Sequence, residues 1–337
     1  MNETVRVDEK DRALLQWLQD EFPVTGRPWR SGAARLGMSE EEVVNRVRRL
    51  SEAGVIRSVH TILDKQKAGP GSSTLVAMKV PEEKIQDVVP VINEYPPVTH
   101  NYLREHKYNL WFTVNAGNER ELTAILDEMK RRTGVSDADL LDLRTRRVFK
   151  TDVRFRFCEK ARATRNRRNP GKSPGETDET DRAILSMTQK AIPLVDEPFR
   201  EISEQLGLEH REVLARIRRR VRDGMIKRIG SSVNQRKLGI VANAVVAWKV
   251  PDDLVEEAGE KLSSFNEVTH CYERSTVPGV WEYNMFTVLH GYDRPSVEAY
   301  AKRLSGMIGI DDYRVIFSTI QFKRMSIIHD IQTIPPR

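Results

Sequence analysis

The chain carries two copies of one sequence, and the distance between matching residues stays at 170 positions over much of each copy. The matched segments are Asp11–Ala13 with Asp181–Ala183, Leu36-Gly37 with Leu206-Gly207, Gly54 with Gly224, Val80-Pro81 with Val250-Pro251, and His100 with His270. A register held this long without a gap indicates duplication of a whole domain pair, because solenoid repeats are much shorter. The chain should therefore contain the same pair of domains twice.

The first part of each copy is predicted to be helical. In the first copy Ser39 and Glu42 form a capping-box pattern, and Gly54 marks the end of the same helix. Between them, apolar residues recur at helical spacing: Val43, Val47 and Leu50. These patterns predict a helix-turn-helix or winged-helix domain over residues 1–66 and again over 178–238.

The second part of each copy alternates strand-like and helix-like segments. In the first copy the order is a strand (STLVAMKVP), a helix (EEKIQDVVPVINEYP), two strands (VTHNYLREH and YNLWFTVNAG), a helix (ERELTAILDEMKRRTG) and a last strand (DLLDLRTRRVFKTDVRFRF). This βαββαβ order predicts a ferredoxin-like domain over 72–157 and 242–328. Both helices should cover one face of each sheet, which leaves the other face for the sister copy.

The expected fold class is therefore α+β, a tandem duplication of a helix-turn-helix domain followed by a ferredoxin-like domain. A segment rich in charge, Pro and Gly separates the copies and is predicted to be an exposed linker at 158–177. We expect the two copies to associate as an internal pseudo-dimer, and the sequence leaves open whether the chain pairs again into a larger homo-oligomer.

Composition narrows the possible partners. The formal net charge of +6 favours an anionic partner, either nucleic acid or an acidic small molecule. The only cysteines are Cys158 and Cys271, so we expect no disulfide framework and a reducing cytoplasm. No apolar run approaches the ~20 residues that span a bilayer, and no cleavable leader is evident, so we expect no membrane contact.

A polar triplet is repeated on one strand of each ferredoxin-like domain. Because side chains alternate along a strand, His100, Tyr102 and Arg104 point to one side. The second copy repeats the pattern with His270, Tyr272 and Arg274. Burying an unpaired guanidinium against the helices would cost several kcal/mol, so we expect both triplets to face a cleft between the copies.

The next strand of each copy adds candidates to the same cleft. In the first copy Asn109 and Trp111 share one face, whereas the opposite face, which should pack on the helices, carries Tyr108, Leu110 and Phe112. The corresponding cleft residues of the second copy are Asn284, Phe286 and His290, with Trp281 in a hairpin loop that is five residues longer. Neither His106 nor His290 has a histidine at the equivalent position of the other copy. This difference indicates that the two sites are specialised, or it has no functional meaning.

Structural explanations compete with these functional ones. A strand histidine beside a tyrosine is often a satisfied structural residue, and duplication copies structural residues too. Arg104 and Arg274 equally suit solvated edge strands, and Trp111 suits sheet packing. No phosphate-binding loop, HExxH or GxSxG motif is present, and the scattered histidines and cysteines argue against a metal site built from protein ligands alone.

DNA binding is the main rival function. The segments NRVRRLSEAG and ARIRRRVRDG place several arginines on the third helix of each helix-turn-helix, the helix that enters the major groove in such proteins. Acidic residues crowd the start of that helix, however, where base contacts normally lie: Glu40, Glu41, Glu42 and Glu209. This arrangement disfavours DNA binding without excluding it.

Each half of the chain resembles the Lrp/AsnC transcriptional regulators, in which a helix-turn-helix precedes a βαββαβ ligand-binding domain. Two longer motifs, HNYLREHKYNLWFT and HCYERSTVPGVWEYNMFTVLHG, are more similar to the paired subunits of siroheme decarboxylase, an Lrp/AsnC-like enzyme of the alternative haem and haem d1 pathways. So are RPWRSGAARLGMSEEEVV and EPFREISEQLGLEHREVL, whose Pro-aromatic pairs depart from the usual regulator. The resemblance covers nearly the whole chain except the linker and tail, with both subunit types fused.

The resemblance implies a carboxy-lyase that converts siroheme to 12,18-didecarboxysiroheme, releasing two acetate carboxyl groups as CO2 without an added cofactor. It implies catalytic roles for His100 and His270, as proton donors, as groups that position the carboxylates, or with one as an axial contact to the substrate iron. The residues expected to bind the anionic tetrapyrrole are Arg104, Arg274, Tyr102, Tyr272, Asn109, Trp111, Asn284, His106, His290 and Trp281. A tetrapyrrole-responsive regulator and a non-catalytic carrier remain as alternatives.

Overall fold

The computed structural model describes residues 4–20, 22–64, 71–157 and 177–324. The chain forms two compact units that each draw on both copies. Of the described residues, unit 1 comprises 4–20, 22–64, 154–157 and 177–239, and unit 2 comprises 71–153 and 240–324. Like parts of the two copies therefore associate with each other. The predicted linker, apart from residue 177, lies outside the described residues.

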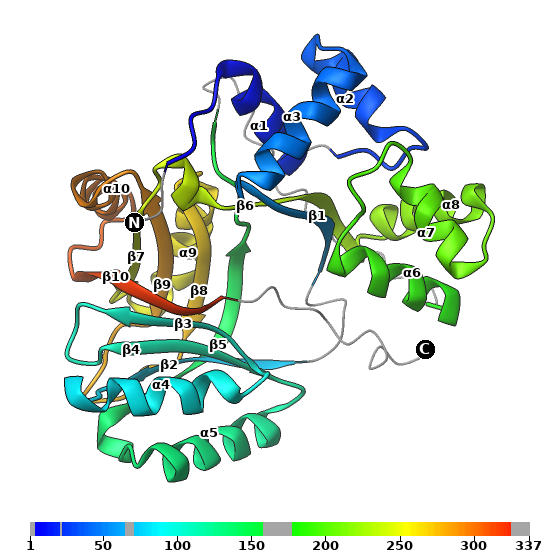
Figure 1. Ribbon diagram of the computed structural model, residues 1–337. Helices are drawn as coiled ribbons and strands as arrows, with labels where there is room; N and C mark the ends of the chain where they lie inside the picture. The colour runs from blue at the N-terminus through cyan, green and yellow to red at the C-terminus, as the bar shows by residue number, and fades with distance from the viewer. Residues whose placement is uncertain (1–3, 21, 65–70, 158–176, 325–337) are drawn as a thin grey trace. The chain divides into compact units, whose positions relative to one another are not determined.

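Unit 1 contains two helix-turn-helix domains, each followed by a strand (Figure 1). The elements of the first copy are α1 (Glu9–Asp20), α2 (Pro28–Leu36), α3 (Glu40–Glu52) and β1 (Ile56–Leu63). Those of the second are α6 (Glu179–Lys190), α7 (Pro198–Leu206), α8 (His210–Arg222), β6 (Ile226–Val233) and η3 (Gln235–Leu238). Strands β1 and β6 pair antiparallel, so one two-stranded sheet joins the two domains.

The third helix of the first copy begins and ends as its sequence predicts. Ser39 Oγ accepts a hydrogen bond from the backbone N–H of Glu42 at 3.0 Å, and Gly54 takes a left-handed φ of 70°. The apolar stripe Val43, Val47 and Leu50 is buried. The reciprocal half of the predicted capping box is not made, because the Glu42 carboxylate accepts from Lys10 and Arg46 instead.

Buried carboxylates tie the first helix of each domain to its third helix. Asp11 on α1 accepts from Arg46 and Arg49, at 2.7 and 2.5 Å. Its counterpart Asp181 is 1 % exposed and accepts from three arginines of α8: Arg216, Arg219 and Arg220. Arg220, itself 1 % exposed, occupies the position that Leu50 fills in the first copy. The second copy thus contains a fully buried ion pair that the first lacks.

Unit 2 contains two ferredoxin-like halves in the predicted element order. The first half consists of β2 (Ser72–Met78), η1 (Glu82–Lys84), α4 (Ile85–Glu94), β3 (Val98–Arg104), β4 (Leu110–Ala116), α5 (Glu119–Thr133), η2 (Asp137–Asp139) and β5 (Leu140–Thr151). The second consists of β7 (Ala242–Trp248), η4 (Asp252–Leu254), α9 (Val255–Ser264), β8 (Val268–Arg274), β9 (Met285–Gly291), α10 (Arg294–Ile308) and β10 (Tyr313–Arg324). The α+β class and the duplication are confirmed.

The two sheets are joined into one closed barrel, in the order β10-β3-β4-β2-β5-β8-β9-β7. The sequence predicted two sheets facing each other across a cleft, so closure is a correction. It arises from the length of the last strands, since β5 pairs with β2 through residues 140–144 and with β8 through 145–151. Strand β10 likewise pairs with β7 and then with β3. Closure leaves neither sheet with an open edge.

Three apolar clusters stabilise unit 2. Helices α4 and α5 cover the first half of the barrel and α9 and α10 the second (Figure 1). Two of the clusters lie between these helices and the strands beneath them. The third lies inside the barrel and draws on both copies: Ala77, Tyr108, Trp111, Leu141, Leu143, Val245, Ala247, Trp281, Phe286 and Ile316. Among the described residues, no helix is both long and apolar enough to cross a bilayer.

The buried ion pair of unit 1 gives a stability prediction. We expect Asp181→Asn to lower the free energy of unfolding by about 3–5 kcal/mol, because Arg220 stays buried without its main counter-charge. The matched change Asp11→Asn should cost about 1 kcal/mol or less, because the side chains of Arg46 and Arg49 reach solvent. Calorimetric melting of both variants checks the difference. Equal losses would show that Arg220 is not the cause.

Candidate functional site

Both polar triplets lie on the inner face of the barrel. Tyr102 on β3 pairs with Trp111 on β4, whose ring belongs to the inner apolar cluster, so His100 and Arg104 share that side. By the same register Tyr272 on β8 pairs with Phe286 on β9. The triplets therefore face away from the helices, as the cost of burying an unpaired guanidinium against the helices predicts.

The two arginines are anchored to the strand contributed by the other copy. Arg104 is 6 % exposed, and its Nη1 donates to the backbone oxygen of Ile316 on β10 at 3.1 Å. Arg274 is 4 % exposed, and its Nη1 donates to Leu143 O at 3.1 Å and to Thr145 Oγ1 at 2.9 Å. Each guanidinium also lies over the ring of the tyrosine two residues before it, at 5.1 and 4.8 Å. Closing the barrel is what fixes these side chains.

The arginines are buried cations without a carboxylate partner in the part of the chain that the structure describes. Burial lowers the pKa of Arg104 and of Arg274 to about 10, which still leaves both charged at neutral pH. The Nε of each is buried and makes no hydrogen bond. A buried charge that lacks a counter-ion is costly, so this surface favours an anionic ligand with acceptor oxygens.

The two histidines share one local geometry. His100 Nδ1 lies 3.0 Å from Thr99 Oγ1, and His270 Nδ1 lies 3.0 Å from Thr269 Oγ1. Each imidazole is partly exposed and stacks on the tyrosine of its triplet, with centroids 6.3 and 5.9 Å apart. Burial raises the pKa of Tyr272 to about 12, so its hydroxyl keeps its proton. These groups can donate and accept protons beside a bound anion.

His290, which has no histidine counterpart in the first copy, lies beside the triplet of the second copy. Its Nδ1 is 3.4 Å from Thr269 Oγ1 and its Nε2 is 2.9 Å from Asn243 Nδ2. It therefore adjoins His270 through a shared threonine. The equivalent position in the first copy is Asn115.

Asn109 and Asn284, predicted to line the cleft, form hydrogen bonds with the backbone of their own copies instead. The Asn109 amide donates to Val80 O and accepts from Val80 N, at 2.8 and 3.0 Å. Asn284 makes the same pair of bonds to Val250. Both amides therefore hold the chain where β2 and β7 end, apart from the triplets.

His106, Trp111 and Trp281 come together in an aromatic cluster at the β3–β4 and β8–β9 loops. His106 lies 5.5 Å from Trp281 and 6.3 Å from Trp111, measured between ring centroids. Burial lowers the pKa of His106, which favours its neutral ring. Tyr108 joins this inner cluster, so the expectation that it packs on the helices was wrong. Both copies contribute to this cluster, because the barrel is closed.

Several polar residues around the triplets were not predicted. Thr99 and Thr269 stand in the repeated VTH, a signal that the sequence does offer. Thr145 and Ser318 reach the triplets only because β5 and β10 pair with the other copy, which no local pattern reveals. Among the described residues, no group of three or more His, Cys, Asp or Glu side chains is arranged to hold a metal ion.

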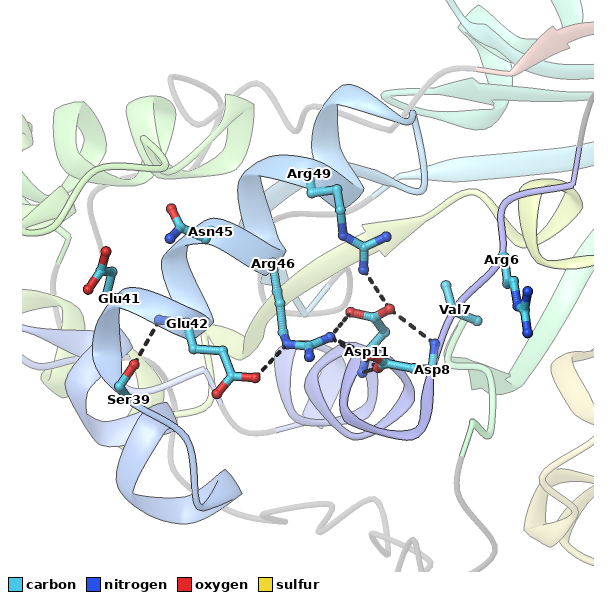
Figure 2. Close-up of a pocket in the computed structure, with 10 residues that line it drawn as sticks. All are labelled: Arg6, Val7, Asp8, Asp11, Ser39, Glu41, Glu42, Asn45, Arg46 and Arg49. Carbon is cyan, nitrogen blue, oxygen red and sulfur yellow. Dashed lines mark hydrogen bonds and ion pairs between the residues drawn. The ribbon is translucent and has the colours of Figure 1, made fainter.

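A pocket of about 850 Å³ in unit 1 is a poor candidate for an anionic ligand (Figure 2). Four carboxylates line it beside three arginines: Asp8, Asp11, Glu41, Glu42, Arg6, Arg46 and Arg49. Figure 2 shows Arg46 and Arg49 directed at Asp11, with Arg46 also bonded to Glu42. Ion pairs within the domain therefore occupy α3 arginines that DNA phosphates would need, and Arg216 and Arg219 are paired likewise on α8.

Comparisons with known proteins match both parts of each copy. A model described as the siroheme decarboxylase NirDL-like HTH domain matches residues 11–57 and 181–226, and the AsnC-like ligand binding domain matches 67–150 and 237–323. The siroheme decarboxylase of Hydrogenobacter thermophilus is 32% identical over 93% of both chains. The crystal structure of the siroheme decarboxylase NirDL aligns with a TM-score of 0.68 at 30% identity, covering 96% of this chain and 94% of that one.

A second solved structure, the siroheme decarboxylase NirDL in co-complex with an iron-uroporphyrin III analogue, aligns with a TM-score of 0.67 at 30% identity. It covers 95% of this chain and 94% of that one. The similarity thus extends over both units and both copies.

Arg104 and Arg274 have no carboxylate partner among the described residues, and this gives a prediction that distinguishes a role in ligand binding from a role in stability. We expect Arg274→Met to leave the free energy of unfolding unchanged or to raise it by up to about 4 kcal/mol, because a costly buried charge is removed. The control Arg220→Met removes an equally buried arginine that does have carboxylate partners, and should destabilise by about 3 kcal/mol. Calorimetry measures both. A loss for Arg274→Met as large as for the control would assign Arg274 a structural role.

Proposed function

The chain belongs to the siroheme decarboxylase family, and on that premise we propose that it converts siroheme to 12,18-didecarboxysiroheme by releasing two acetate carboxyl groups as CO2. The observation that carries the proposal is the pair of buried arginines without carboxylate partners, one from each copy, on strands that also carry a histidine. In each step the bond between the acetate methylene and the carboxyl carbon breaks. A proton then adds to the methylene, giving a methyl group and CO2.

Arg104 and Arg274 serve as carboxylate anchors in this proposal. Siroheme is a flat polycarboxylate, and a charge-assisted hydrogen bond contributes about 1.5–3 kcal/mol. The unbonded Nε of each guanidinium supports the assignment, because it offers a donor that the described protein groups leave unused. Tyr102 and Tyr272, which stack on the guanidinium groups, complete the binding surface.

His100 and His270 supply the protons in this proposal. The reaction consumes one proton for each CO2 released, and each copy provides one imidazole beside its arginine strand. The conjugated macrocycle accepts the electron pair left by CO2, so the protein's task is to orient the acetate and protonate it. No added cofactor enters the scheme, and the iron belongs to the substrate. We place the reaction in the cytoplasm, in the synthesis of haem or haem d1.

Anaerobic incubation with siroheme tests the activity directly. We expect the mass of the tetrapyrrole to fall by two CO2 molecules, with matching CO2 release, as measured by mass spectrometry. An unchanged mass with a shifted visible spectrum would make the protein a carrier. Salt-dependent, sequence-specific DNA binding without conversion would make it a regulator.

Separate substitution of the two histidines tests their proposed roles. If each serves one carboxyl group, His100→Ala and His270→Ala should each stop at a mono-decarboxylated product, and the two products should be different isomers. The double variant should release no CO2 while still binding siroheme. Full conversion by both single variants would remove the histidines from the chemistry.

Loss of one anchor should weaken ligand binding. We expect Arg104→Met and Arg274→Met each to raise the Kd for iron-uroporphyrin III by roughly 10- to 150-fold, the factor that 1.5–3 kcal/mol gives. Spectroscopic titration measures the Kd. Arg303→Met, which removes an exposed arginine of α10 that pairs with Glu267, is the matched control and should leave it unchanged.

A further inference from the structure

The inner wall of the barrel differs between the two copies at the positions beside the histidines. Residues paired across antiparallel strands have their side chains on the same face, with Cβ atoms about 5 Å apart. His100 pairs with Thr113 of β4, whereas His270 pairs with Val288 of β9. This position therefore holds a hydroxyl group in the first copy and a methyl group in the second.

The positions beside the tyrosines differ in the same sense. Tyr102 pairs with Gln321 of β10, whereas Tyr272 pairs with Val148 of β5. In each case the partner lies on the long strand contributed by the other copy. The triplet of the first copy is thus flanked by polar side chains on both neighbouring strands, and that of the second copy by valines.

Asn115 adds a third polar group to the wall of the first copy. Its Nδ2 atom is buried and has no hydrogen-bond partner among the described residues. The wall of the second copy keeps polar side chains at Thr151 and His290, and both already take part in interactions within the protein. Since a buried N–H without an acceptor is costly, Asn115 favours a ligand that brings an acceptor oxygen to the first wall.

The differing side chains lie at the end of the barrel where the inner face is accessible. His100 and His270 stand near the start of their strands, whereas the opposite end is filled by buried aromatic rings such as Trp111 and Phe286. The flanking residues of both walls are partly exposed, namely Thr113, Gln321, Val148 and Val288. A ligand edge that reaches either histidine therefore contacts them.

We propose that Thr113 and Gln321 are specificity-determining residues that bind a carboxylate on the tetrapyrrole edge beside His100, whereas Val148 and Val288 suit an edge with an apolar substituent. The inference rests on the proposed function. A hydroxyl and an amide donate hydrogen bonds to a carboxylate, and such charge-assisted bonds are strong. Valine side chains offer no donor, but they pack on a methyl group.

This difference gives the reaction intermediate a preferred orientation. Loss of the first CO2 leaves a molecule with one acetate and one methyl group at the two reacting positions. The methyl group fits the valine wall and the remaining acetate fits the polar wall. The mono-decarboxylated intermediate therefore binds with its acetate beside His100.

Exchange of the wall residues tests the proposal with two probes, iron-uroporphyrin III and iron-coproporphyrin III, which carries a methyl group in place of each acetate. Spectroscopic titration measures both Kd values. Thr113→Val with Gln321→Val should raise the Kd for iron-uroporphyrin III by about 10- to 150-fold and leave that for iron-coproporphyrin III unchanged or lower. Val288→Thr with Val148→Gln should raise the Kd for iron-coproporphyrin III, because its methyl groups would meet polar groups that they leave unpaired.

A single substitution of similar size guards against an effect of misfolding. Gln321→Glu keeps the shape of the side chain and adds a negative charge, so it should also weaken binding of iron-uroporphyrin III. The control Gln205→Glu makes the same chemical change on the exposed face of α7 and should leave the Kd at the wild-type value. Calorimetric melting close to that of wild type shows that each variant is folded.

The outcomes separate this proposal from the one on which it rests. If the ratio of the two Kd values is the same in wild type and in both exchanged proteins while wild type converts siroheme, only the assignment of the wall residues fails. If the wild-type protein binds neither porphyrin and leaves siroheme unchanged, the proposed function fails and the assignment fails with it.

Discussion

Unit 2 depends on the double pairing of its two longest strands. Strands β5 and β10 each hold 12 residues, enough to complete their own sheet and then continue along an edge strand of the other copy. This pairing satisfies edge groups that would otherwise be exposed, and it encloses an apolar cluster drawn from both copies. It also supplies the backbone oxygens that hold Arg104 and Arg274, so sheet closure positions both guanidinium groups.

The sequence predicts the elements well and their partners poorly. Alternation along VTHNYLREH put His100, Tyr102 and Arg104 on one face, and the cost of burying an unpaired guanidinium placed that face away from the helices. The 170-residue register revealed the duplication. Local pattern has no means of saying that Arg274 meets Leu143, because that contact depends on which edges pair across the copies. Asn109, which shares a strand face with Trp111 by parity, bonds instead to the backbone of Val80 in its own copy, beyond the end of β2.

In the helix-turn-helix unit, several arginines of the third helices are directed at buried carboxylates. Asp11 holds Arg46 and Arg49 of α3, and Asp181 holds Arg216, Arg219 and Arg220 of α8, so these pairs connect the first helix to the third in each domain. The sequence showed these arginines and the acidic residues near them, but the spacing between Asp11 and Arg46 is too long for a local rule to pair them. A charge run on a helix therefore says little about its partner until the facing helix is known.

Fusion of the copies has a consequence for how the barrel assembles. If the copies were two separate chains, closing the barrel would be a bimolecular event, and the closed barrel would dissociate on dilution. In one chain the sister strands meet at a fixed effective concentration, so closure does not depend on how much protein is present. Covalent linkage also allows the two copies to differ in sequence, whereas a symmetric homodimer has the same residue at equivalent positions of both subunits. The histidine at position 290, where the first copy has Asn115, is a difference that such a dimer has no way to encode.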